Sequence, residues 1–257
     1  MHNSNRQTST AIDFHFNSLH LVGILLILVC NSDNFVLLFP WQNTSLPAAV
    51  RILNIISLLT VEEKASLLST SNPAIPRINL PAYSFAYECE RGFTSGGAGT
   101  AFPSGVGLAG TFNSSLVFEV ARWTALEARA STNVDGNAGT NCFGPVLNFI
   151  HDATWGRTNE MLTGEDTFLG SVLGSAFVNG LQSWREASNV PGDFDFYSTS
   201  STVKHLNGYS GPEGYGYTFG RTALRFSFDV MIPSRAWKEF FLPQYRAAAL
   251  ADAAGYI

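Results

Sequence analysis

The chain has 257 residues, of which 46% are hydrophobic and 14% charged, a composition typical of a folded globular protein and not of a disordered one. Its formal net charge is -5, and its Lys and Arg residues are scattered, so the sequence disfavours nucleic acid as a partner. Neither a GxxxxGK[ST] loop nor a GxGxxG fingerprint occurs, and the His and Cys residues lack CxxC or HExxH spacing. We therefore expect no nucleotide, no metal and no other cofactor.

The N-terminal segment has the features of a secretory signal. Its apolar run, Leu19–Val29, is short for a membrane span and is followed by small and polar residues. We expect residues 1–32 to be a signal peptide and no stable membrane span, although the long polar leader leaves an uncleaved anchor as an alternative. Glycosylation sequons begin at Asn43 and Asn113, and they agree with a secreted glycoprotein.

The rest of the chain alternates between helix and strand signals. The segment at 45–47 resembles a helix start followed by apolar residues at helical spacing, and Thr60 and Glu63 have the spacing of a capping box. Three prolines within residues 71–81 indicate a connecting loop. Strands are expected at 82–87, 141–149 and 202–206, and long helices at 114–131, 166–184 and 233–254. This alternation predicts a parallel sheet with helical crossovers, either a barrel or a doubly wound open sheet.

Ligands of both architectures bind in the loops that follow the carboxyl ends of the strands. In the second of these loops, the Arg157 guanidinium offers a fork of donors for two neighbouring sugar hydroxyls, and Trp155 offers an apolar face for a sugar ring. The alternative is a surface pair of Arg157 with Glu160 and a Trp155 in the core. We interpret the adjacent Glu165 and Asp166 as a helix cap and not as a catalytic dyad.

The first and third loops add further polar candidates. Lys204 and His205 end a predicted strand and supply hydrogen-bond donors, with a purely structural His205 as the alternative. No GxSxG elbow occurs, which disfavours a Ser-His-Asp hydrolase. In the first loop, Glu88 and Glu90 either accept hydrogen bonds from sugar hydroxyls or pair with Arg91. The residues alone thus indicate a polar cleft for a sugar or another small molecule on an α/β scaffold.

Several motifs in a fixed order resemble glycoside hydrolase family three, whose members include β-glucosidases, β-xylosidases and N-acetylhexosaminidases. They are LTVEEK at 59–64, IPR at 75–77 with LP at 80–81, TAFP at 100–103, EARA at 127–130, WGRTNEMLTGED at 155–166, and KH at 204–205 with GY at 208–209. The resemblance implies an α/β fold, a (β/α)₈-type (TIM-like) barrel domain at residues 33–257 that is incomplete at the C-terminus. It also implies a secreted glycosidase that acts on small sugars or oligosaccharides.

The resemblance assigns roles to four residues. Arg157, Lys204 and His205 match the residues that hold the hydroxyls of the terminal sugar, and Glu88 matches an acidic residue after the first strand. The family's glucosidases usually have Asp at the position of Glu88, whereas Glu is similar to the xylosidase and arabinosidase branch. The resemblance therefore implies a β-xylosidase/α-arabinofuranosidase-like enzyme of xylan breakdown, with β-glucosidase as an alternative.

The sequence also departs from the family pattern. Arg91 stands where the family has His, and residues 151–154 replace its usual RDPR segment. Family members are retaining enzymes with an Asp nucleophile on a later strand and a separate acid/base residue. We therefore expect no catalytic residue in this chain, and the alternative function is a secreted, non-catalytic carbohydrate-binding fragment. Cys89 and Cys142 either pair or are simply buried.

Overall fold

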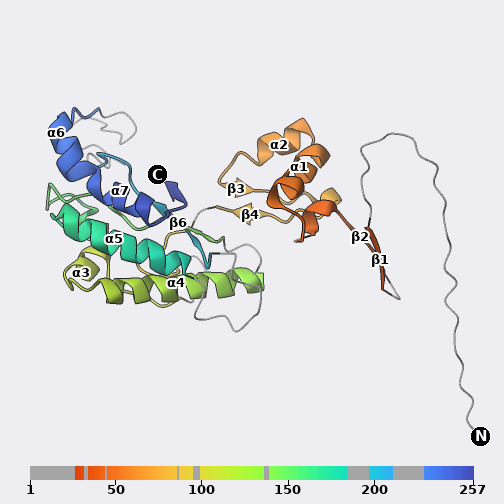
Figure 1. Ribbon diagram of the computed structural model, residues 1–257, viewed down its shortest axis with the longest axis horizontal. Coiled ribbons are helices and arrows are strands. Elements are labelled where there is room, and N and C mark those ends of the chain that lie inside the picture. The colour runs from red at the N-terminus through yellow and green to blue at the C-terminus, as the bar shows by residue number, and fades with distance from the viewer. Residues whose placement is uncertain are drawn as a thin grey trace, which may run out of the picture. The chain divides into compact units, whose positions relative to one another are not determined.

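The computed structural model describes residues 27–31, 34–43, 45–85, 87–94, 99–135, 139–183, 197–210 and 229–257. The chain divides into two compact units, residues 1–59 and 60–257. In the first unit, β1 (Ile27–Asn31) pairs antiparallel with β2 (Asn34–Leu38), and α1 (Ala48–Leu58) follows (Figure 1). Residues 1–26 of the expected signal peptide lie outside the described residues.

The second unit contains the remaining elements. Its helices are α2 (Val61–Ser66), α3 (Gly105–Ala109), α4 (Ser114–Asp135), α5 (Thr167–Gln182), α6 (Ser234–Ala236) and α7 (Pro243–Leu250). Its strands are β3 (Ser71–Asn72), β4 (Tyr83–Ser84), β5 (Asn141–Cys142), β6 (Ser200–Val203) and β7 (Gly255–Tyr256). Short 3₁₀ turns lie at Pro76–Ile78 and Thr158–Glu160, and a π-helical turn at Trp237–Phe241 separates α6 from α7.

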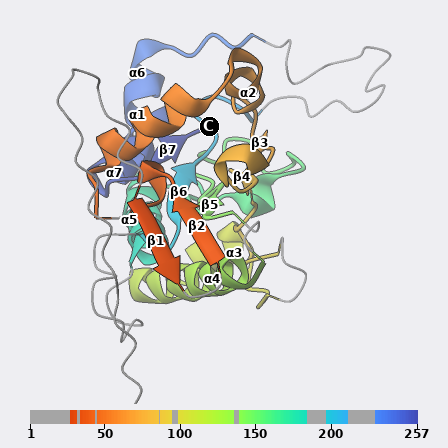
Figure 2. The ribbon, with the colours of Figure 1, turned by 90° about the vertical axis from the view of Figure 1, so that its right-hand side faces the viewer.

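Strands β5, β6 and β7 lie side by side in chain order and are parallel. Tyr87 extends this order, because it forms a parallel bridge with Cys142 of β5. Helix α5 connects β5 to β6, and α7 precedes β7. Helices α4, α5 and α7 lie beside these strands (Figure 2). The predicted parallel sheet with helical crossovers is therefore confirmed, and the described residues contain no closed barrel.

The helices begin where the capping patterns place them. Thr60 Oγ1 accepts from the Glu63 amide at 3.2 Å, while Glu63 Oε2 accepts from the Thr60 amide at 2.8 Å, which completes the predicted capping box. The Asp166 carboxylate accepts from the amides of Phe168 and Leu169, so its interpretation as a helix cap is confirmed. Pro233 precedes α6 at the predicted helix start, but the expected long helix at 233–254 is divided into α6, the π-helical turn and α7, which ends at Leu250.

The main core lies between α4 and α5. Its buried side chains include Val117, Ala121, Ala125 and Ala128 of α4, and Leu173, Phe177 and Leu181 of α5. Gly180 allows the two helices to approach closely, because a Cβ at this position would lie 2.4 Å from the Phe118 carbonyl oxygen. Trp123 of α4 and Leu53 of α1 are exposed, although both side chains are large and apolar.

The strands are shorter than predicted. The expected strand at 141–149 is regular only at β5, because Pro145 has no amide hydrogen to donate to a neighbouring strand. Farther along, Val146 forms single parallel bridges with Met161 and Lys204. The expected strand at 82–87 is divided. Strand β4 pairs antiparallel with β3, which lies in the segment predicted as a loop, whereas Tyr87 alone joins the parallel sheet.

None of the helices in the described ranges is long and apolar enough to cross a membrane.

Candidate functional site

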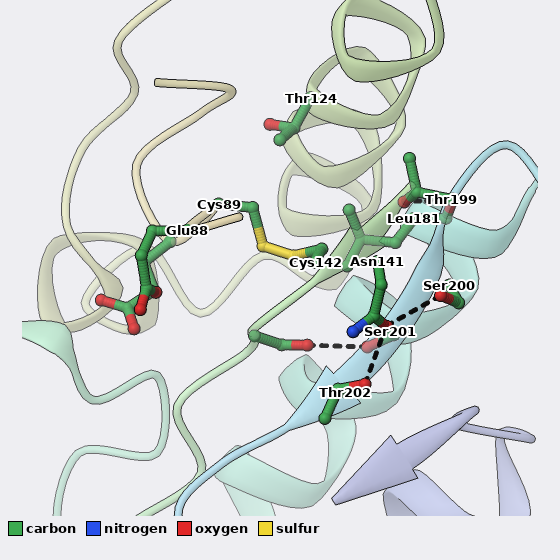
Figure 3. Close-up of a disulfide and its surroundings, with 12 residues drawn as sticks. Glu88, Cys89, Thr124, Asn141, Cys142, Leu181, Thr199, Ser200, Ser201 and Thr202 are labelled. Atoms are coloured by element: carbon green, nitrogen blue, oxygen red, sulfur yellow. Dashed lines mark hydrogen bonds between the residues drawn. A yellow bond between two sulfur atoms is a disulfide. The ribbon is translucent and has the colours of Figure 1, made fainter. Parts of the chain in front are cut away.

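A disulfide joins the loop after Tyr87 to strand β5. Cys89 and Cys142 are bonded, with their Cα atoms 5.6 Å apart, so the pairing that the sequence left open is present. Figure 3 shows the Cys89 side chain directed towards Cys142 and the Glu88 side chain on the other side of the loop. The disulfide therefore holds the residues that flank Cys89 next to the ends of the parallel strands.

A cavity of about 470 Å³ lies at the carboxyl end of β6. Its lining residues are Glu88, Phe143, Arg157, Lys204, His205, Leu206, Asn207, Tyr209 and Ile257. The structure thus gathers all four residues that the sequence analysis selected, Glu88, Arg157, Lys204 and His205, around one space. Its volume lies within the range that is ordinary for small-molecule sites.

Lys204 forms the buried floor of this cavity. Its side chain is only 4% exposed, and its Nζ donates a hydrogen bond to Glu88 Oε2 at 2.6 Å. The same Nζ lies 2.7 Å from Glu90 Oε1 in an ion pair. The two carboxylates are thus directed at Lys204, while Arg91 is exposed, so the alternative pairing with Arg91 is wrong.

The two carboxyl groups deeper in the site have opposite pKa shifts. Burial raises the pKa of Glu90 to about 7, although the adjacent Lys204 acts in the other direction. Burial also acts to raise the pKa of Glu160, but the hydrogen bonds and charge of Arg157 outweigh it and hold that pKa below its ordinary value. Of these two groups, Glu90 is therefore the one that takes up a proton more readily.

Glu160 and Tyr209 hold Arg157 at the cavity. Its Nε and Nη2 donate to Glu160 Oε1 and Oε2 at 2.8 and 2.6 Å, and its Nη1 donates to the Tyr209 hydroxyl at 3.0 Å. The guanidinium also lies over the Tyr209 ring, 5.5 Å from its centre. The ion pair that the sequence analysis weighed as an alternative is thus present, and the guanidinium lines the cavity as well.

Trp155 does not line the cavity. It packs against the buried Val146, Ile150 and Met161, and its ring meets the edge of the Tyr209 ring at 5.7 Å. Trp155 is thus half-buried against the core, which favours the alternative interpretation, and its role as an apolar face for a sugar ring stays a prediction. Among the described residues, the aromatic rings that line the cavity are those of Phe143, His205 and Tyr209.

His205 combines a structural and a cavity-lining position. Asn148 Oδ1 accepts from the His205 amide at 2.9 Å and lies 3.1 Å from its Nδ1, while Asn148 Nδ2 donates to the His205 carbonyl at 3.2 Å. The Tyr245 hydroxyl donates to the same carbonyl at 2.7 Å. The imidazole lies against the Tyr209 ring with the ring centres 4.2 Å apart. These contacts hold the ring at the cavity wall.

Residues 52–225 match the family description "Glycosyl hydrolase family 3 N terminal domain". This chain belongs to glycoside hydrolase family 3. The chain is 33% identical over 216 residues to the Xylan 1,4-beta-xylosidase of Xylanibacter ruminicola, covering 80% of this chain and 23% of that protein. It is 30% identical to a Probable exo-1,4-beta-xylosidase of Neosartorya fischeri, covering 80% of this chain and 26% of that protein. The chain therefore spans about a quarter of the length of these relatives.

Solved structures of the family share this fold. A GH3 exo-beta-xylosidase in complex with a xylobiose aziridine probe superposes with a TM-score of 0.72 over 84% of this chain and 27% of that chain, at 24% identity. A mutant beta-glucosidase from Listeria innocua in complex with laminaribiose gives a TM-score of 0.51 at 27% identity, covering 79% of this chain and 23% of that chain. The fold is thus that of the N-terminal domain of family 3 glycosidases.

Sequence reasoning missed several residues of this family 3 site. Tyr209 stands in the GY motif that follows Lys204 and His205, yet only the structure shows that it lines the cavity and contacts Arg157 and His205. Asn148 lies within a predicted strand, where no local pattern indicates a partner 57 residues away. Glu90 was weighed as a candidate, but nothing in its spacing indicated an ion pair with Lys204.

The remaining candidates fall outside the cavity. Asn113 Oδ1 accepts from the Leu116 amide and caps α4, and Asn43 Oδ1 accepts from the Ser45 amide. Their glycosylation stays a prediction. No cluster of three or more His, Cys, Asp or Glu side chains that could hold a metal ion occurs within the described ranges.

Proposed function

We propose that this chain is the sugar-binding part of a retaining exo-β-glycosidase of the β-xylosidase/α-arabinofuranosidase type. Arg157, Lys204 and His205 donate hydrogen bonds to the hydroxyls of the terminal sugar, and Glu88 accepts one. The observation that carries the proposal is the cavity that these four side chains line together, with the buried ammonium of Lys204 at its floor. The Arg157 guanidinium and the Lys204 ammonium are hydrogen-bond donors, and the Glu88 carboxylate is an acceptor. Each hydroxyl of a sugar can both accept and donate a hydrogen bond, so it suits such a mixed set of groups.

The proposal places this site in a larger enzyme. The consecutive parallel order of β5, β6 and β7, continued by the bridge at Tyr87, supports a (β/α)₈ barrel in which these are the first strands. No residue of this chain is assigned as nucleophile or acid/base, and we propose that residues 33–257 contribute sugar binding. We also propose a secreted glycoprotein, on the basis of the apolar run at Leu19–Val29 and the sequons at Asn43 and Asn113.

Arg157→Ala tests the assignment directly. Loss of the guanidinium removes donors from the cavity and the hydrogen bond to the Tyr209 hydroxyl, so we expect D-xylose to bind the chain at least about tenfold more weakly, as for a lost charged hydrogen bond. NMR titration measures the affinity, and circular dichroism shows whether the fold is retained. Undiminished affinity in a folded variant would contradict the proposed site.

Arg122→Ala is the matched control for Arg157→Ala. Arg122 also forms an ion pair with a Glu three residues away, Glu119, and its guanidinium also lies over an aromatic ring, that of Trp123 at 5.3 Å. It stands on α4 and does not line the cavity. We expect this variant to bind D-xylose with the affinity of the unchanged chain.

Glu88→Asp tests the preference for pentoses. The shorter side chain opens space at the cavity mouth and lengthens the 2.6 Å contact with Lys204. Since one methylene changes discrimination by about tenfold or more, we expect the ratio of D-glucose to D-xylose affinity to rise at least about tenfold. Competition between the two sugars, followed by ligand-detected NMR, measures the ratio. An unchanged ratio would leave β-glucosidase activity equally well supported.

A further inference from the structure

Two carboxylates hold the same ammonium group, but they differ in their access to a ligand. Glu88 is 62% exposed at the cavity mouth, whereas Glu90 is 13% exposed. Their contacts with Lys204 Nζ are nearly equal, at 2.6 and 2.7 Å. Glu88 can therefore exchange its contact with Lys204 for a contact with a ligand, while Glu90 is shielded from one.

Glu90 has little access to any partner other than the charged groups of the site. The small space beside it is lined by Glu160 and by apolar residues that include Leu108, Val146 and Phe177. On its other side, the Glu90 side chain passes close to Gly144. Apolar surroundings do not stabilise a carboxylate, so an ionised Glu90 depends on the charge of Lys204.

The charges of the site favour a proton on Glu90. The groups that face Glu90 are Lys204, Glu88 and Glu160, and Arg157 in turn pairs with Glu160. Two cations thus stand against three carboxyl groups. Burial raises the pKa of Glu90 to about 7. When Glu90 carries a proton, the positive and negative charges of the site balance. When Glu90 is ionised, Lys204 has two anionic partners, Glu88 and Glu90.

We propose that Glu90 is a positioning residue that holds the Lys204 ammonium from the buried side and thereby frees Glu88 to accept a hydrogen bond from the bound sugar. This inference rests on the sugar site proposed above. A buried ammonium is costly to leave without a counterion, so without Glu90 a sugar would compete with Lys204 for Glu88. With Glu90 ionised, Lys204 keeps a partner while Glu88 turns to the ligand.

The inference predicts that sugar affinity depends on pH. Below about pH 7, Glu90 is protonated and Lys204 relies on Glu88 alone, so the affinity for D-xylose is low. Between pH 6 and pH 8, Glu90 ionises and the affinity rises by about fivefold to tenfold, because the ionised fraction of a group with a pKa of about 7 rises about tenfold over this range. The chemical shifts of the chain, measured by NMR titration with D-xylose at each pH, report this step.

Glu90→Gln removes the charge of Glu90 and retains its shape. We expect this variant to bind D-xylose about tenfold more weakly than the unchanged chain at pH 8, with no rise between pH 6 and pH 8. Glu119→Gln is the control, since it removes a carboxylate that pairs with Arg122 on α4 away from the cavity. It is expected to keep both the affinity and the pH step.

A second readout does not depend on sugar binding. The rate of reductive methylation of Lys204, followed by mass spectrometry at pH 8, is expected to rise several-fold in Glu90→Gln because one of the two partners of the ammonium is lost. An unchanged rate would overturn the positioning role. The absence of a pH step in the unchanged chain would overturn it too, even if the variant failed to fold.

The outcomes separate this inference from the function on which it rests. If the unchanged chain binds D-xylose and Glu90→Gln binds it equally well at pH 8, Glu90 is not a positioning residue and the sugar site stands. If the unchanged chain does not bind D-xylose at any pH, the proposed sugar site fails. The methylation rate of Lys204 then still decides whether Glu90 holds the ammonium.

Discussion

Replacing Cys89 and Cys142 together with Ala is expected to lower the free energy of unfolding by about 4 kcal/mol, because the disulfide closes a loop with a sequence separation of 53. The loss arises mainly in the unfolded chain, which regains the conformations that the closed loop excludes. Urea unfolding followed by circular dichroism measures the difference. Sugar binding is also expected to weaken, since Glu88 and Glu90 flank Cys89 in the loop that the disulfide anchors to β5.

Reduction provides the control for the disulfide prediction. Dithiothreitol is expected to lower the stability of the unchanged chain to about the level of the double variant, and to leave the double variant itself unaltered. Mass spectrometry after thiol alkylation confirms which form is present. Equal unfolding midpoints for the oxidised and reduced chain would show that the bond adds nothing to stability.

Lys204→Met is expected to abolish measurable D-xylose binding and to destabilise the fold by about 3 kcal/mol at pH 8, the usual scale for removing one partner of a buried ion pair. The variant leaves Glu90 buried without its cation, while Glu88 is exposed and can be solvated. The loss is expected to be smaller at pH 5.5, where a protonated Glu90 needs no counterion. Urea unfolding at the two pH values measures both losses.

The sign of this pH effect follows from linkage. The folded-state pKa of Glu90 lies above its ordinary value, so the folded chain binds more protons at this group than the unfolded chain between about pH 4.5 and pH 7. The contribution of Glu90 to stability therefore falls as pH rises through this window. Without Lys204, this pKa rises further and the fall extends to higher pH.

Lys64→Met is the matched control for Lys204→Met. Lys64 lies exposed on α2, so its replacement removes one positive charge without uncovering a buried carboxylate. Its stability is expected to stay within about 0.5 kcal/mol of the unchanged chain at either pH. If Lys204→Met is as stable as Lys64→Met at pH 8, the buried ion pairs do not support the fold.

The helices were the most predictable part of the fold. The helices expected at 114–131 and 166–184 are present as α4 and α5. The Asp166 carboxylate accepts hydrogen bonds from two amides in the first turn of α5, as its interpretation as a cap predicts. Strands were less predictable, because each is completed by segments far away in the chain. The interruption at Pro145 and the pairing of β4 with β3 reduced two expected strands to short pieces.

The sequence alone determined the helices and their caps, and it selected Glu88, Arg157, Lys204 and His205, because capping and helical periodicity act within a few residues and the family motifs are local. The tertiary structure decided the pairing of Cys89 with Cys142 and the placement of Glu88 and Glu90 around Lys204. These partners stand between 53 and 116 residues apart. The elevated pKa of Glu90 also depends on burial, and burial exists only once the helices and strands have packed together.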